Sequence, residues 1–114
     1  MPTPWPAPKL HALANSPGIL AIFASSDLCE TFDLCILSEK GRAGKPEAKW
    51  KALARAVAVL TFELGELMWT TNNEGLSMRI ILHGNLALVV FSESGHIAGR
   101  SLSRALERIF NVVL

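Results

Sequence analysis

Two cysteines and three histidines are the residues of this sequence best suited to nucleophilic, redox or metal chemistry. Cys29 and Cys35 are separated by five residues, which is not the C-x-x-C spacing of thioredoxin-like redox sites. We expect Cys35 in the core of an apolar strand and Cys29 in a turn, with an exposed thiol. A hairpin between them would bring the two sulfurs toward bonding distance, but free thiols are the default in a chain without an export signal.

The three histidines, His11, His83 and His96, are scattered along the chain. A metal ion needs several converging ligands, so we expect His11 on a helix surface, His83 in a hairpin turn, and no metal site. The segment "GRAGK" at 41–45 faintly resembles a phosphate-binding loop, but Pro46 replaces the Ser or Thr of that motif. Without a nucleophile elbow or a nucleophile–base pair at a recognisable spacing, the sequence predicts neither an enzyme nor a cofactor.

The composition indicates one globular domain. Half of the 114 residues are apolar, 18% are charged, and the net charge is +1. No basic block is present, which argues against nucleic acid as a partner. No apolar run reaches the roughly 18 residues of a membrane span, so we expect no membrane insertion and a cytoplasmic location. The segment "MPTPWPAP" at 1–8 predicts a flexible Pro-rich tail, followed by a single domain over 9–114.

Periodicity and turn residues divide the chain into eight elements. We expect helices at 9–15, 46–68 and 96–113, and strands at 18–26, 32–38, 69–71 and on both sides of "HGN" in "MRIILHGNLALVVF". The segment 39–46 is expected to be a solvated loop and 72–75 a turn. This order, α-β-β-α-β-β-β-α, predicts an α+β fold with a central antiparallel five-stranded sheet and helices packed on it. The long helix, through Trp50 and Val57, and the last helix, through Leu106 and Ile109, are expected to cover one face of the final hairpin.

The outer side of the long helix is its most informative part. Lys51, Arg55, Glu63 and Glu66 define a polar back in a helical projection, yet two large apolar residues, Val59 and Phe62, fall in the same sector, and Ala52 and Ala58 lie nearby. Burying both large side chains would contribute about 3–5 kcal/mol. Small alanines beside them permit close approach of another helix, so this side predicts a surface that a partner covers.

Three stretches together resemble the Roadblock family of dynein light chains and bacterial polarity proteins. They are "LHALANSPGILAIFASSD", "AKWKALARAVAVLTFELGEL" and "MRIILHGNLALVVFSESG", the last followed by an amphipathic helix. The longer connection "SSDLCET" departs from the short turn that the family often has between its first two strands. The resemblance implies a Roadblock-like, profilin-like sandwich over 9–114, and a homodimer formed through the central helix and the strand near 68–74, with the two helices antiparallel. The interface residues expected on this basis are Ala52, Arg55, Val59, Phe62, Glu63, Glu66, Met68 and Thr70.

The leading functional hypothesis is therefore a non-enzymatic, homodimeric interaction module. By resemblance, it would scaffold or regulate a partner protein such as a small Ras-like GTPase, or a motor or polarity complex. Two alternatives stay open at this point: a small-molecule-sensing α+β domain with a ligand between sheet and helix, and a thiol redox protein that uses Cys29 and Cys35.

Overall fold

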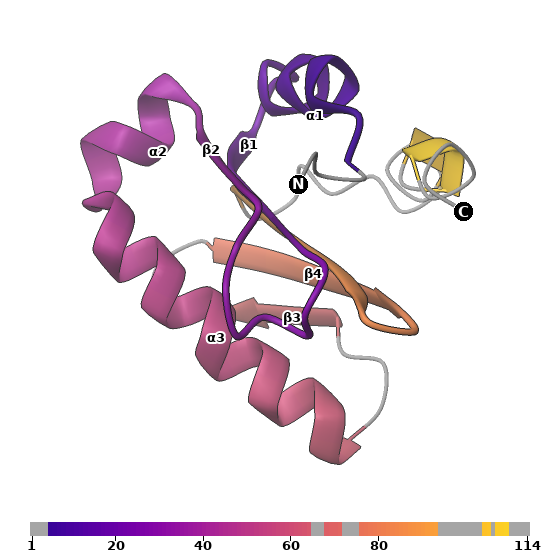
Figure 1. The fold of residues 1–114 in the computed structure, drawn as a ribbon. Coiled ribbons are helices and arrows are strands. Elements are labelled where there is room, and N and C mark those ends of the chain that lie inside the picture. Colours follow the sequence, from indigo (N-terminus) through magenta and orange to yellow (C-terminus); the bar gives the residue numbers. More distant parts are fainter. Residues whose placement is uncertain (1–4, 65–67, 72–75, 94–103, 106, 110–114) are drawn as a thin grey trace.

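The computed structural model describes residues 5–64, 68–71, 76–93, 104–105 and 107–109. Its elements follow the order α1 (Ala7–Ala14), β1 (Ile19–Ser25), β2 (Leu34–Leu37), α2 (Glu39–Gly44), α3 (Glu47–Leu64), β3 (Met68–Thr71), β4 (Leu76–His83) and β5 (Leu86–Glu93). The strands form one antiparallel sheet in the order β2-β1-β5-β4-β3 (Figure 1). The predicted α+β class, with helices on an antiparallel sheet, is confirmed. The turn expected at 72–75 lies outside the described residues.

Helices cover both faces of the sheet, as Figure 1 shows for α1 and α3. One face packs under α1 and the described C-terminal helical residues, in a core of Trp5, Leu10, Ala14, Ile19, Ile22, Ala24, Ile36, Leu88, Val90 and Ile109. The other face packs under α3, in a core of Ala21, Phe23, Cys29, Trp50, Ala54, Val57, Ala58, Leu76, Met78, Ile80, Ala87, Val89 and Phe91. The prediction that both helices cover one face of the hairpin is therefore wrong. Successive strand residues point to opposite faces, so the nearly unbroken apolar runs of β1 and β5 supply both cores.

The N-terminal helix begins earlier than the sequence predicts. Pro6 accepts the backbone N–H groups of Lys9 and Leu10 at 3.0 and 3.1 Å, which starts α1 at Ala7. The Trp5 side chain is only 4% exposed and belongs to the core under α1. Residues 5–8 are thus part of the folded domain, and the expected tail over 1–8 is corrected to that extent. The apolar area of a tryptophan outweighs the extended preference of the prolines around it.

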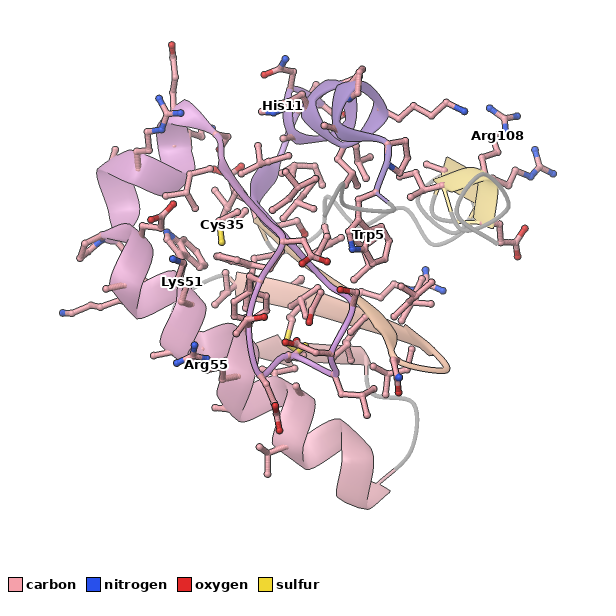
Figure 2. All side chains as sticks on the ribbon, in the orientation of Figure 1. Trp5, His11, Cys35, Lys51, Arg55 and Arg108 are labelled. Atoms are coloured by element: carbon pink, nitrogen blue, oxygen red, sulfur yellow. The ribbon has the colours of Figure 1, made fainter. Side chains whose placement is uncertain are left out.

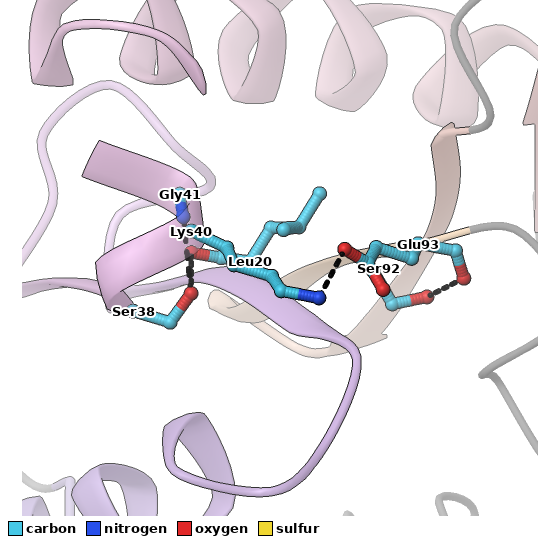
Figure 3. Close-up of polar contacts among 6 residues, drawn as sticks. All are labelled: Leu20, Ser38, Lys40, Gly41, Ser92 and Glu93. Carbon is cyan, nitrogen blue, oxygen red and sulfur yellow. Dashed lines mark hydrogen bonds and ion pairs between the residues drawn. The ribbon is translucent and has the colours of Figure 1, made fainter. Parts of the chain in front are cut away.

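The expected loop over 39–46 contains a short helix, α2. Ser38 caps it, because its Oγ accepts the Gly41 N–H at 3.1 Å and donates to the Leu20 carbonyl oxygen of β1 at 3.2 Å (Figure 3). A Cβ on Gly41 would lie 2.0 Å from that same carbonyl oxygen. Glycine at this position therefore lets α2 lie directly against β1. The adjoining ion pair, between Lys40 Nζ and Glu93 Oε1 at 3.1 Å, ties α2 to the end of β5.

The long helix and the final hairpin form largely where expected, with different ends. Pro46 accepts the N–H groups of Lys49 and Trp50, so α3 starts at Glu47, and Met68 lies on β3 rather than on the helix. Residues 83 and 86 pair directly, which leaves a two-residue connection, Gly84-Asn85, in place of the three residues expected. Gly84 has φ +60°, the conformation that a type II′ turn requires at its first position.

Candidate interaction surface

The outer face of α3 is open to solvent where the structure describes it. Val59 is 55% exposed, and Ala52, Arg55 and Ala56 on the same side of the helix are exposed as well. The predicted exposure of Val59 is confirmed. Ala58, expected near the polar back, is instead 1% exposed and packs in the core under α3. Trp50, Ala54 and Val57 are buried, and their burial fixes the rotation of the helix. The Val59 side chain therefore cannot turn inward without exposing them.

Not all the residues expected at an interface can be placed. Phe62 and Glu63 lie on α3, and Met68 and Thr70 on β3, but their side chains are outside the described part of the chain. Glu66 lies outside the described residues altogether. For Ala52, Arg55 and Val59, the structure places the side chains together on one helix face, and their role in an interface stays a prediction.

A concave surface flanks this face, between α3 and the β1–β2 connection. Its volume is about 550 Å³. The lining residues are Asp27, Leu28, Cys29, Glu30, Arg55, Ala58 and Val59. Among the described residues, two large apolar side chains are exposed, Val59 and Leu28 (37% exposed), and both line this one surface. We call it the loop–α3 groove.

Hydrogen bonds around Ser25 hold the β1–β2 side of the groove. The Ser25 Oγ accepts the backbone N–H groups of Asp27 at 3.2 Å and of Cys29 at 2.9 Å. Its proton is donated to the Thr31 carbonyl oxygen at 2.6 Å or to Asp27 Oδ1 at 2.7 Å. The Asp27 carboxylate also accepts the backbone N–H of Thr31 at 2.9 Å and the Thr31 hydroxyl. Hydrogen bonds of the Ser25 and Asp27 side chains thus hold the connection from Ser25 to Thr31, although it contains neither helix nor strand.

These bonds determine the charge of Asp27. The hydroxyl and backbone N–H of Thr31, and then the hydroxyl of Ser25, stabilise the carboxylate and lower the pKa of Asp27 to about 2. Asp27 is therefore anionic at neutral pH. The structured connection and the lowered pKa of Asp27 were not predicted from the sequence. The signal is nevertheless present, because Ser, Asp and Thr at 25, 27 and 31 are residue types whose side chains bond nearby backbone N–H groups in turns.

Arg55 joins the helix to the connection. Its guanidinium donates to the Glu30 carbonyl oxygen at 3.2 Å and lies 5.9 Å from the centre of the Phe32 ring. Figure 2 shows Arg55 on the side of α3 that faces the connection. Within the described part of the chain, the bond to Glu30 uses one of the five N–H donors of the guanidinium. The two walls of the groove are therefore held together by contacts that involve this side chain.

The cysteines are free and poorly suited to redox chemistry. Cys29, expected to be exposed, is only 4% exposed, so that prediction is wrong. Burial, together with the nearby Asp27 carboxylate, raises the pKa of the Cys29 thiol to about 11. Burial also raises the pKa of Cys35, although Lys51 opposes the effect. Because the thiolate is the reactive form, both groups are less nucleophilic at neutral pH than an ordinary cysteine.

Among the residues that the structure describes, the remaining candidate groups do not assemble into a site. In the part of the chain that the structure describes, no three His, Cys, Asp or Glu side chains come close enough to hold a metal ion. His11 is exposed on α1, as predicted, while the side chain of His83 and all of His96 lie outside the description. The N–H groups of Gly41 and Arg42 bond to Ser38, so "GRAGK" builds the capped helix α2 rather than a phosphate cradle. Among the described helices, none has the length and apolar character needed to cross a membrane.

Comparisons of this chain with models of known protein families and with curated proteins find no match. The functional assignment therefore depends on the geometry of the α3 face, and on the resemblance of the three sequence stretches.

Proposed function

We propose that this protein is a non-enzymatic interaction module that forms a homodimer through the outer face of α3. The single observation that carries the proposal is the exposure of Val59, at 55%, on the same helix face as the exposed small residues Ala52 and Ala56, which precede it by seven and three residues. Alanines beside a large apolar residue allow a second helix to approach closely and bury it. A symmetric dimer would use the same face on both copies.

The sheet edge beside α3 supports the same arrangement. β3 stands at the end of the strand order and spans Met68–Thr71. An end strand presents backbone N–H and C=O groups to one side, and pairing with the same strand of a second copy satisfies them. Under the Roadblock resemblance, helix and end strand would act together in one interface.

The paired copies would present a composite surface to another protein. By the same resemblance, this partner is a small Ras-like GTPase or a component of a motor or polarity complex. The antiparallel sheet with helices on it is compatible with that family's domain, and the choice of partner class depends on the resemblance of the three sequence stretches.

The test is the mass of the protein in solution. Sedimentation or light scattering at micromolar concentration should give a dimer for the wild type. Val59→Glu should give a monomer, because it would bury an unpaired carboxylate at the interface. Ala12→Glu, an equally drastic change at an exposed position of α1, should leave the dimer intact. A wild type that stays monomeric at high micromolar concentration would contradict the proposal.

A further inference from the structure

The sheet has a second end strand, β2, on the side opposite β3. In Figure 1 it crosses in front of the other strands, with α1 above it and α3 to its left. Its four residues, Leu34–Leu37, are apolar, and they carry none of the Lys, Pro or bulge features that commonly keep an edge strand from pairing. Short length is the one such feature that β2 has. The strand therefore presents an apolar edge with which an extended chain can pair.

Half of the backbone groups of β2 point away from the sheet. Ser38 lies opposite Leu20 and donates its N–H to the Leu20 carbonyl oxygen at 3.0 Å. Because alternate residues of an antiparallel pair bond to the partner strand, Ile36 also bonds to β1, whereas Cys35 and Leu37 direct their N–H and C=O groups outward. Within the described part of the chain, none of these four outward groups bonds to another protein group, and both residues are half-buried. The geometry of these groups fits another extended strand.

The side chains along this edge indicate what a pairing strand would contain. Cys35 and Leu37 pack against the core under α3, while Leu34 and Ile36 pack against the core under α1. A residue of an added strand that lies directly opposite Cys35 would therefore point toward the α3 side, and its two neighbours toward the α1 side. The α1 side of β2 is apolar, so it favours apolar side chains at those two neighbouring positions.

On the α3 side, the charge beside β2 is positive on balance. Figure 2 shows Lys51 beside Cys35, on the side of α3 that faces β2. The Lys51 side chain is 40% exposed, and its Nζ forms only a long ion pair, at 3.8 Å, with Glu47 Oε2. Burial raises the pKa of the Cys35 thiol, and of the two charges that act on it, Lys51 lowers this pKa by more than Glu47 raises it. An acidic side chain opposite Cys35 would thus be attracted, whereas a second acid opposite Asp33 would meet a like charge.

We propose that β2 adds an extended segment of a partner protein to the sheet, in which one Asp or Glu lies opposite Cys35 between two apolar residues. Pairing of β2 with β2 of a second copy is less favourable, because the symmetry axis would lie near Cys35 or Ile36 and bring the two Lys51 ammonium groups together. The inference goes beyond the proposed homodimer and does not depend on it. That homodimer would use α3 and β3, and would leave a β2 strand at each outer end of the combined sheet.

Amide hydrogen exchange, followed by NMR, tests the edge itself. In the free protein, the N–H groups of Cys35 and Leu37 should exchange much faster than the N–H of Ile36. A synthetic peptide, STVEVTS, in saturating excess should slow exchange at Cys35 and Leu37 by about tenfold or more and leave Ile36 little changed. General stabilisation of the fold would not produce this alternation.

Three outcomes of the exchange experiment would overturn the proposal. Slow exchange at Cys35 and Leu37 without peptide would show that the edge is already covered. Protection that grows with protein concentration in the absence of peptide would assign the edge to a second copy of the chain. Unchanged exchange at both positions in excess peptide would show that β2 does not accept the segment.

Reversal of one charge tests the acidic position, with fluorescence anisotropy of labelled peptides as the measurement. Lys51→Glu should bind STVEVTS about tenfold more weakly than the wild type, and should prefer STVKVTS, in which lysine replaces the central glutamate. Lys49→Glu makes the same change at an exposed position of α3, about 200° around the helix from Lys51, and should bind both peptides like the wild type. A folding defect in Lys51→Glu would weaken both peptides rather than reverse their order. Equal binding of the two peptides to the wild type would contradict the acidic position.

These measurements are independent of the mass measurement that tests the homodimer. A monomeric wild type that binds STVEVTS through β2 would contradict the homodimer and support the edge. A dimeric wild type that fails the exchange experiment would leave the homodimer standing and overturn the edge.

Discussion

The hydroxyl of Ser25 lies at the end of β1 and is fully buried. It interacts with backbone groups of Asp27, Cys29 and Thr31, three of the residues that form the connection to β2. The Asp27 carboxylate bonds the far end of the same connection. Two polar side chains thus fix a segment that has no regular secondary structure, and this fixed segment forms one wall of the groove beside α3.

Acid should weaken this connection. The pKa of Asp27 is lowered from an ordinary 3.8 to about 2 in the folded chain, so the stability it contributes is fully present above about pH 4 and is lost as the pH falls toward 2. Asp27→Asn should reduce the dependence of the unfolding free energy on pH in this window, as measured by urea denaturation with tryptophan fluorescence. Asp33→Asn, in the same connection, serves as the control. An unaltered pH dependence in Asp27→Asn would contradict the assigned bonds.

At the scale of the element, α2 illustrates how a glycine-rich segment becomes helical. "EKGRAG" has poor helix propensity because of its two glycines. The Ser38 cap compensates at one end, and the Trp50 indole N–H donates to the Gly41 carbonyl oxygen at 2.9 Å. Glycine is needed at position 41 because α2 lies so close to β1 there, and not because the helix itself requires it. The contacts that hold α2 in place therefore come from three segments of the chain: Ser38 before the helix, Leu20 on β1 and Trp50 on α3.

The two glycines of α2 should respond oppositely to alanine. Gly41→Ala would place a Cβ 2.0 Å from the Leu20 carbonyl oxygen, so we expect a loss of about 2 kcal/mol or more in unfolding free energy. Gly44→Ala meets no atom within 4 Å and should be neutral or stabilising by up to about 1 kcal/mol. Thermal unfolding measures both. Equal effects at the two positions would be inconsistent with the close approach of α2 and β1.

At the scale of the whole molecule, the sheet separates two cores. α3 contributes to one, and α1, Trp5 and Ile109 to the other. Residues near both ends of the chain thus meet on the same face of the sheet, although about 100 positions separate them. This arrangement leaves the outer face of α3 available for a partner, since the C-terminal helical residues that the structure describes lie on the opposite side.

Removal of Trp5 should destabilise the whole domain. Its side chain is 4% exposed, and replacing a buried tryptophan by alanine costs about 3–5 kcal/mol. We therefore expect Trp5→Ala to unfold at a clearly lower urea concentration than the wild type, followed by circular dichroism. His11→Ala, at an exposed position of α1, should change the unfolding free energy by no more than about 0.5 kcal/mol. A Trp5→Ala variant as stable as the wild type would restore the interpretation of this segment as a tail.

The sequence alone determined the α+β class, the position of α3 and the exposure of Val59. Each of these follows from local periodicity and turn residues, which act over a few positions. Only the tertiary structure decided which face each helix covers, because apolar runs such as β1 suit either side of a sheet. It also decided the conformation of Leu28, the helix at Glu39–Gly44 and the burial of Trp5 and Cys29. These features depend on contacts between segments distant in the sequence, where packing and hydrogen bonding outweigh local preference.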